Sequence, residues 1–252
     1  MHSALPVRRA TITTASKTKS GAETRSALIW DWPVRVFHWL LVLSLAGSWI
    51  TAEAGYDWTE QHFLFGYFAL GLIVFRLLWG VTGTRHARFA NFTLSPRQAL
   101  ESTRRLLTRS KRDYAGHNPL GAWSVVLMLM LVAVQATTGL FISDDIFYAG
   151  PYNGVVSSDL AGTLAQVHHL NFTALQIVVA LHVVSVLWYL WGKRQNLLRP
   201  MITGRKALPM ALQHEAIDES RSGRAWLVIV IAAAAVTALV QLAPPPPVVD
   251  YF

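Results

Sequence analysis

Five long apolar stretches alternate with polar segments along the chain, over residues 34–52, 62–80, 120–141, 169–191 and 225–243. Each stretch has about the length that crosses the hydrocarbon core of a bilayer as a helix, roughly 20 residues. Three of the five contain no Asp, Glu, Lys or Arg. The pattern predicts an all-α integral membrane protein with five transmembrane helices.

The composition supports a membrane protein and narrows its chemistry. Hydrophobic residues make up 53% of the chain and charged residues only 14%, whereas a soluble domain has about a quarter charged residues. The chain contains no cysteine, which excludes disulfides, thiolate-bound iron–sulfur clusters and thioether-attached haem. Histidine is therefore the obvious candidate for a metal ligand.

Lys and Arg residues gather in every second segment outside the predicted spans. Of the 22, five precede the first span, eight lie between the second and third, and seven lie between the fourth and fifth. The segments 53–61, 142–168 and 244–252 have none and carry seven acidic residues instead. The positive-inside rule therefore predicts a cytoplasmic N-terminus and an external C-terminus. Since the positive charge follows from topology, nucleic acid is not expected as a partner.

The spans also divide the chain into five predicted regions. These are a mobile cytoplasmic tail, a four-helix bundle, a cytoplasmic linker, a fifth transmembrane helix and an external tail, over residues 1–27, 28–206, 207–224, 225–243 and 244–252. Residues 96–109 mix leucines with arginines, which fits either an amphipathic interfacial helix or a solvated connector. The long external segment 142–167 is expected to have a function of its own.

Nine histidines occur, and their positions separate them into groups. Three fall in tails or basic loops and are expected to be solvated: His2, His86 and His214. His117 precedes Asn118 and Pro119, which indicate a helix N-cap and a first-turn proline, so a structural or interfacial role is favoured. Five lie in or beside the spans, where ionisable residues usually face the bundle interior: His38, His62, His168, His169 and His182.

Depth places these five histidines at two levels. His38 lies about one turn inside the cytoplasmic face, and His62 lies at the external edge of the second span. His182 follows His168 by 14 residues, which is roughly 21 Å of helix. The predicted pairs are therefore His38 with His182 on the cytoplasmic side, and His62 with His168 or His169 on the external side.

Helical periodicity distinguishes His168 from its neighbour. At about 100° per residue, a 14-residue step returns to within roughly 40° of its starting direction, whereas a 13-residue step ends about 140° away. His168 is therefore expected to share the inward face of His182, and His169 to point elsewhere. Two imidazoles that face each other across a bundle suit a flat ring whose iron binds one nitrogen on each side. Zinc or copper would usually gather three or four ligands at one level.

Several motifs in combination resemble the bacterial cytochrome b561 family, which includes the cytochrome b subunits of membrane nickel–iron hydrogenases. They are WDWPVRVFHW from Trp30, HFLFGYFALGLIVFRLLWG from His62, GTRHARF from Gly83, HNPLGAW from His117, and the span that runs from His168 to His182. The resemblance covers about residues 28–206. It implies a four-helix transmembrane haem bundle, to which this chain adds a fifth C-terminal transmembrane helix and a PPPP sequence after Ala243.

The resemblance also implies two non-covalent haem b groups. The family's ligand pattern maps onto His38 and His182 for the cytoplasmic-side iron, and onto His62 and His168 for the external-side iron. Arg76, which is 14 residues after His62, lies near the level of the cytoplasmic-side pair. Its guanidinium is expected either to bind a haem propionate, with Arg35 as a second candidate, or to extend to the cytoplasmic headgroups.

Iron with an imidazole on each side has no open position for a substrate, so such haems transfer electrons. We therefore expect a transmembrane electron carrier of the bacterial inner membrane, an oxidoreductase-type subunit rather than a stand-alone catalyst. Its expected partners are membrane quinone and an external, periplasmic redox protein such as a cytochrome c or a hydrogenase. The alternatives are a superoxide oxidase that reduces quinone, which the acidic external face disfavours, and a haem-free membrane transporter or scaffold.

Overall fold

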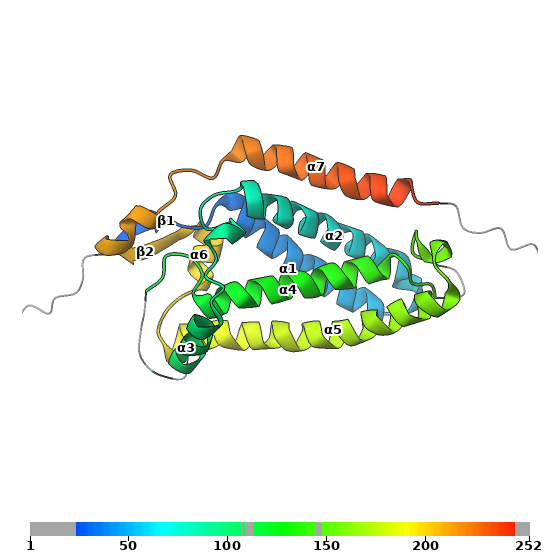
Figure 1. The fold of residues 1–252 in the computed structure, drawn as a ribbon, viewed down its shortest axis with the longest axis horizontal. Coiled ribbons are helices and arrows are strands. Elements are labelled where there is room, and N and C mark those ends of the chain that lie inside the picture. Colours follow the sequence, from blue (N-terminus) through cyan, green and yellow to red (C-terminus); the bar gives the residue numbers. More distant parts are fainter. Residues whose placement is uncertain (1–23, 107, 109–112, 145–147, 245–252) are drawn as a thin grey trace, which may run out of the picture.

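Five long helices make up most of the computed structural model, which describes residues 24–106, 108, 113–144 and 148–244 (Figure 1). They are α1 (Trp32–Glu53), α2 (Thr59–Thr82), α4 (Pro119–Gly139), α5 (Ser158–Leu187) and α7 (Ser222–Gln241). Each is long and apolar enough to cross a membrane. The predicted all-α, multi-pass membrane architecture is therefore confirmed. Most of both predicted tails, with His2 and the PPPP sequence apart from Pro244, lies outside the described residues.

Polar side chains fix where three of these helices begin. Asp31 accepts a hydrogen bond from the backbone N–H of Val34 and caps α1. Asn118 caps α4 through Gly121, as the sequence predicts, and Ser157 caps α5 through Leu160. An N-cap oxygen satisfies a backbone donor that has no partner within the helix.

Helix α5 is longer than its apolar stretch. It begins at Ser158, inside the segment expected to be an external loop, and it continues into a π-helical turn, η4 (Trp188–Gly192). The connection from α4 to α5 is correspondingly shorter and contains the 3₁₀ turn η3 (Asn153–Val155). As a result, His168 lies well inside a continuous helix instead of at its edge.

Helix α5 packs mainly along α4 and contacts α1 only through individual side chains. Helix α1 packs along α2, α4 packs along α5, and α2 also contacts α4 and α7 (Figure 1). The largest apolar core includes Phe37, Ile73, Trp79 and Val132. Leu175 is the only buried residue of α5. Side chains such as Trp49 and Phe172, whose ring centres lie 6.2 Å apart, therefore connect α1 to α5.

A folded cap covers the end of the bundle at which α1 and α4 begin, which we call the basic end. Strand β1 (Thr24–Leu28) pairs antiparallel with β2 (Arg205–Pro209), between α6 (Leu198–Thr203) and the 3₁₀ turn η5 (Met210–Glu215). Gly204, with a φ of 79°, makes the turn from α6 into β2. The strand pair extends across two predicted region boundaries, 27/28 and 206/207, so residues 24–27 belong to this cap.

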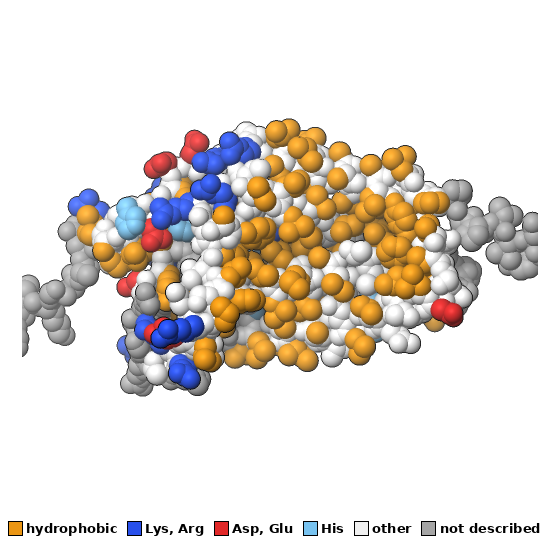
Figure 2. Space-filling model, in the orientation of Figure 1, with side chains coloured by type: hydrophobic (Ala, Val, Ile, Leu, Met, Phe, Trp, Pro, Cys, Tyr) orange, Lys and Arg blue, Asp and Glu red, His pale blue; other side chains and the backbone are white. Residues whose placement is uncertain are grey.

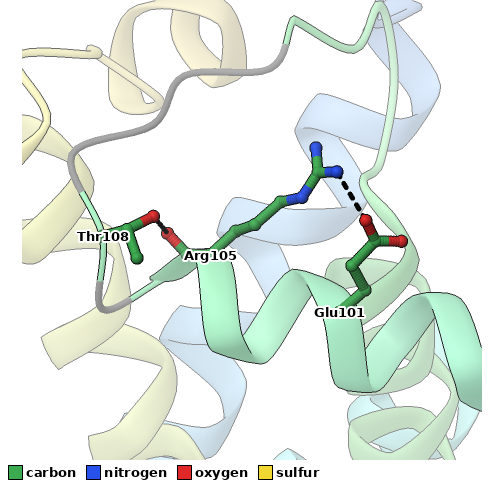
Figure 3. A network of polar contacts seen from close by, with 3 residues as sticks. All are labelled: Glu101, Arg105 and Thr108. Atoms are coloured by element: carbon green, nitrogen blue, oxygen red, sulfur yellow. Dashed lines mark hydrogen bonds and ion pairs between the residues drawn. The ribbon is translucent and has the colours of Figure 1, made fainter.

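Helix α3 (Pro96–Leu106) lies against α4 at the basic end, and none of its residues is buried. The structure therefore agrees with a helix in segment 96–109 and not with a connector without secondary structure. The guanidinium of Arg105 binds the carboxylate of Glu101 one turn earlier, and the Thr108 hydroxyl donates to the Arg105 carbonyl (Figure 3). Because both charged side chains are exposed, this ion pair contributes less than about 1 kcal/mol.

Helix α7 lies on the outer side of α2, where Ala225, Val228 and Ala232 are buried. It begins at Ser222 and ends at Gln241, slightly before the predicted range. The Arg224 guanidinium donates to the Thr82 carbonyl, and the Tyr152 hydroxyl donates to the Leu239 carbonyl. The fifth helix is therefore attached at both ends and lies beside the other four long helices.

The surface separates apolar and basic side chains along the long axis. Figure 2 shows apolar side chains over the middle of the molecule and Lys and Arg gathered at the basic end. Many large apolar side chains in the middle are exposed, among them Leu43, Ile50, Leu170 and Leu181. Such a surface suits contact with lipid tails instead of water.

Asp31 joins the start of α1 to the end of α2. Its side chain is 1% exposed. Oδ1 accepts from the Val34 N–H at 2.8 Å, and Oδ2 accepts from Trp79 Nε1 at 3.1 Å and from the Thr84 hydroxyl. Without this carboxylate, the indole and hydroxyl donors would be buried and unsatisfied, which is costly.

Replacing Asp31 with Ala should therefore destabilise the protein by roughly 3 kcal/mol, since three donors lose their acceptor. Unfolding of the detergent-solubilised protein, followed by tryptophan fluorescence, measures the change. Glu101→Ala on exposed α3 is the control and should cost less than about 1 kcal/mol. Equal losses in the two variants would show that Asp31 has no special structural role.

Candidate functional site

Two histidines face each other across the bundle, towards the end opposite the basic end. The ring centres of His62 on α2 and His168 on α5 lie 6.4 Å apart, with the ring planes inclined at 70°. Two axial imidazoles place their ring centres about 6.3 Å apart when each metal–nitrogen bond is about 2 Å long. The pair therefore has the spacing of two ligands on opposite sides of one metal ion.

Hydrogen bonds at Nδ1 orient both rings. His62 Nδ1 donates to the Ser48 carbonyl of α1 at 2.9 Å. His168 Nδ1 lies 3.0 Å from Thr138 Oγ1, and the Thr138 hydroxyl donates its own proton to the Val134 carbonyl. The Thr138 oxygen therefore accepts from His168. In both rings the proton lies on Nδ1, which leaves the lone pair of Nε2 available to a metal.

His169 occupies a different face of α5. Its side chain is exposed, and its ring centre lies 6.1 Å from that of His168. His168, in contrast, is partly buried and turned towards α2. The two faces are those that helical periodicity predicts.

The second histidine pair lies nearer the basic end. His38 on α1 and His182 on α5 are both partly buried. His38 Nδ1 is buried and has no hydrogen-bond partner among the described residues. Burying a polar nitrogen without a partner in an apolar bundle is costly, and in this respect His38 differs from His62 and His168.

Of four glycines near the histidines, Gly66 alone leaves open space. A carbon added at Gly66, one turn after His62, would meet no atom within 4 Å, whereas one at Gly139 would contact the His168 ring at 3.4 Å. Carbons added at Gly47 and Gly121 would meet Phe65 and Asn118. Among the described residues, no three His, Cys, Asp or Glu side chains gather as a zinc or copper site requires. The facing imidazoles of His62 and His168 and the open position at Gly66 therefore fit haem.

The two arginines inside the spans have different surroundings. Arg76 is 3% exposed, its guanidinium carbon lies 4.5 Å from the centre of the Phe89 ring, and its Nη1 is buried without a partner among the described residues. Asp31 lies close enough to Arg76 to interact with its charge. Arg35 donates through Nη1 to the Ile202 carbonyl, while its Nε is buried and unpaired. The burial of Arg76 shows that its side chain does not extend to the surface.

Two of the remaining histidines belong to an aromatic cluster at the basic end. His117 packs against Trp30 and Phe92, with ring centres 4.6 and 5.1 Å apart. Burial lowers the pKa of His117 to about 3, and the nearby Arg76 and His86 act in the same direction. His117 is therefore neutral at pH 7, consistent with the structural role favoured for it.

The prediction that His86 is solvated is wrong, whereas His214 is exposed as expected. His86 is 9% exposed, because the loop after α2 folds back so that its ring lies near Trp30. Its Nε2 donates to the Glu215 carbonyl at 2.8 Å. Burial is also the main reason why the pKa of His86 is lowered.

The polar groups that support the histidines were not predicted from the sequence. Besides Thr138, Asn171 donates to the Leu131 carbonyl at 2.9 Å and to Gln135 Oε1 at 2.7 Å, so it joins α5 to α4. Asn171 follows His168 by three residues, and Gln135 precedes Thr138 by three. Polar residues one turn apart within apolar spans are the signal that would have indicated this contact.

Comparison with known proteins identifies the family. A family model described as prokaryotic cytochrome b561 matches residues 29–204, which is more than half of the chain. The chain belongs to the prokaryotic cytochrome b561 family. The family resemblance seen in the sequence is thereby confirmed, and this b561 protein is a membrane electron carrier that binds haem b.

Three curated relatives of this b561 protein are each named "Probable Ni/Fe-hydrogenase B-type cytochrome subunit". The relative from Rhizobium leguminosarum bv. viciae is 25% identical over 219 residues, which cover 73% of this chain and 90% of the relative. Those from Cupriavidus necator and Rhodobacter capsulatus are also 25% identical and cover 77% and 72% of this chain, and 93% and 81% of their own lengths. No solved structure matches the chain.

The geometry of the histidines predicts different results at the two neighbouring positions of α5. His168→Ala should lower the haem content of the purified b561 protein, because it removes one of the two imidazoles that face each other between α2 and α5. His169→Ala should retain the haem, because its side chain is exposed. A pyridine haemochrome assay on both variants measures the ratio of haem to protein. The reverse pattern would contradict the assignment.

Proposed function

We propose that this b561 protein carries electrons across the membrane through two haem b groups. His62 and His168 would ligate the iron of the external-side haem, and His38 and His182 that of the cytoplasmic-side haem. The principal support is the facing pair His62 and His168, with ring centres 6.4 Å apart and both Nδ1 atoms engaged in hydrogen bonds.

The proposed ligands lie at two depths because α5 supplies one to each pair. His168 and His182 are 14 residues apart on this continuous helix, a separation of roughly 21 Å. When imidazoles occupy both axial positions, the iron has no free site for a substrate. Two such groups at different depths provide a route for single electrons through the bilayer.

The proposed partners are membrane quinone and an external redox protein. The relatives named as hydrogenase subunits support a hydrogenase as the external partner, and a cytochrome c is the alternative. The segments opposite the basic end contain acidic residues such as Asp57 and Asp159 but no Lys or Arg. Their negative charge would attract a basic partner surface and speed its association. By the positive-inside rule, the basic end faces the cytoplasm across an inner membrane.

This function is tested with the purified protein, first in detergent and then in liposomes. Reduced-minus-oxidised spectra combined with haem quantification should give two haem b groups per chain, and His38→Ala and His182→Ala should each lose the same one. In liposomes that contain quinone, an external electron donor whose potential is lower than that of the quinone should reduce the haems and, through them, the quinone. A haem-free protein, or haems that exchange no electrons with quinone, would contradict the proposal.

Arg76 is proposed to bind a propionate of the cytoplasmic-side haem through its unpaired Nη1. Arg76→Leu should make this haem harder to reduce, because a positive charge about 10 Å away stabilises the ferrous form by roughly 1–2 kcal/mol. Redox titration should therefore show a lower midpoint potential for this haem, an unchanged one for the external-side haem, and a smaller shift in Arg76→Lys. Unchanged midpoint potentials in Arg76→Leu would contradict the proposal that Arg76 binds a propionate.

A further inference from the structure

The imidazoles of the two proposed haem sites differ in their hydrogen bonds. On the external side, His62 donates to the Ser48 carbonyl and His168 donates to the Thr138 hydroxyl. On the cytoplasmic side, His38 Nδ1 is buried without a partner among the described residues. The polar environment of the ligands is therefore asymmetric across the membrane.

Thr138 Oγ1 is placed to accept from His168 when that ring binds iron through Nε2 and carries its proton on Nδ1. The residue is 6% exposed, and its own hydroxyl proton has two acceptors within α4, the Val134 and Gln135 carbonyls, at 2.8 and 3.1 Å. Threonines in membrane helices often make this bond to their own helix and no other. Here the remaining lone pair faces His168 Nδ1 at 3.0 Å. One turn away, Asn171 joins the same two helices.

An acceptor at Nδ1 changes how the ring binds iron. It draws the Nδ1 proton away from the ring, which makes Nε2 a stronger electron donor to the metal. A stronger donor stabilises ferric iron more than ferrous iron and therefore lowers the reduction potential. The Ser48 acceptor is a backbone carbonyl that substitution leaves in place. His168 has two acceptors nearby, the Thr138 hydroxyl and the Gln135 carbonyl, and substitution can remove the hydroxyl.

We propose that Thr138 is a positioning residue that lowers the potential of the external-side haem below that of the cytoplasmic-side haem. This inference rests on the two-haem function proposed above. A single electron from an external donor would convert the external-side iron from ferric to ferrous and then pass to the ferric cytoplasmic-side iron. The transfer would be downhill towards the cytoplasm, and the positive charge of Arg76 on that side would act in the same direction.

The test compares Thr138→Val with Thr138→Ser by redox titration of the purified, haem-loaded protein. The His168→Ala variant identifies which titration step belongs to the external-side haem. In Thr138→Val this haem should become easier to reduce, with a roughly threefold to tenfold rise in its reduction equilibrium constant. Tenfold corresponds to about 59 mV for one electron. Thr138→Ser keeps the hydroxyl and should titrate like the unmodified protein.

Thr82→Val is the matched control, because the Thr82 hydroxyl donates to the Leu78 carbonyl one turn earlier but faces no histidine. It should leave both potentials unchanged. The ferric low-spin signal in electron paramagnetic resonance should change for the external-side haem in Thr138→Val alone. Since valine has nearly the shape of threonine and lacks only the hydroxyl, these results together would support the role of the hydroxyl.

The remaining outcomes are also decisive. Loss of the external-side haem from Thr138→Val with retention in Thr138→Ser would support a need for the hydroxyl. Loss from both variants, an unchanged potential in Thr138→Val, or an unmodified protein whose external-side haem has the higher potential would overturn the inference. An unmodified protein without two haems would instead overturn the proposed function.

Discussion

Imidazole nitrogens inside a bilayer have no water to bond with, and this requirement relates the helices of the bundle to one another. A buried polar group without a partner costs a large part of a protein's net stability. His62 meets the requirement with a carbonyl of α1, and His168 meets it with a side chain of α4. Each ring therefore connects its own helix to a neighbour, and in both rings the hydrogen bond is made by Nδ1, which leaves Nε2 free of it.

At the basic end, the buried carboxylate of Asp31 likewise connects helices to one another. Asp31 is almost fully enclosed, and it accepts three hydrogen bonds. A hydrogen-bonded charge can be buried, whereas one without such bonds is strongly destabilising. The caps and strands around Asp31 hold the starts of α1 and α4, and so they fix the depth of His38 relative to the rest of the bundle.

Features that depend on residues close together in the chain could be predicted from the sequence. The spans follow from runs of apolar residues, the cap at Asn118 from local hydrogen bonding, and the opposite faces of His168 and His169 from the helical period. The strand pair, the burial of His86 and the support from Thr138 could not be predicted, because each depends on contacts between residues distant in the chain. The N-terminal extension of α5, residues 158–167, was missed because polar residues and Gly162 interrupt its apolar ones. Such a mixed composition does not separate a loop from a helix that projects out of the membrane.

Helix α5 supplies one proposed ligand to each haem, and this has a mechanical consequence. A helix is stiff along its axis, so the separation of His168 and His182 changes little when the loops or the neighbouring helices move. In the proposed two-haem arrangement, the helix would therefore fix the tunnelling distance between the two irons. An insertion or deletion of one residue between these histidines would rotate one ligand by about 100° relative to the other. Between these two histidines, α5 should therefore tolerate changes of side chain but not of length.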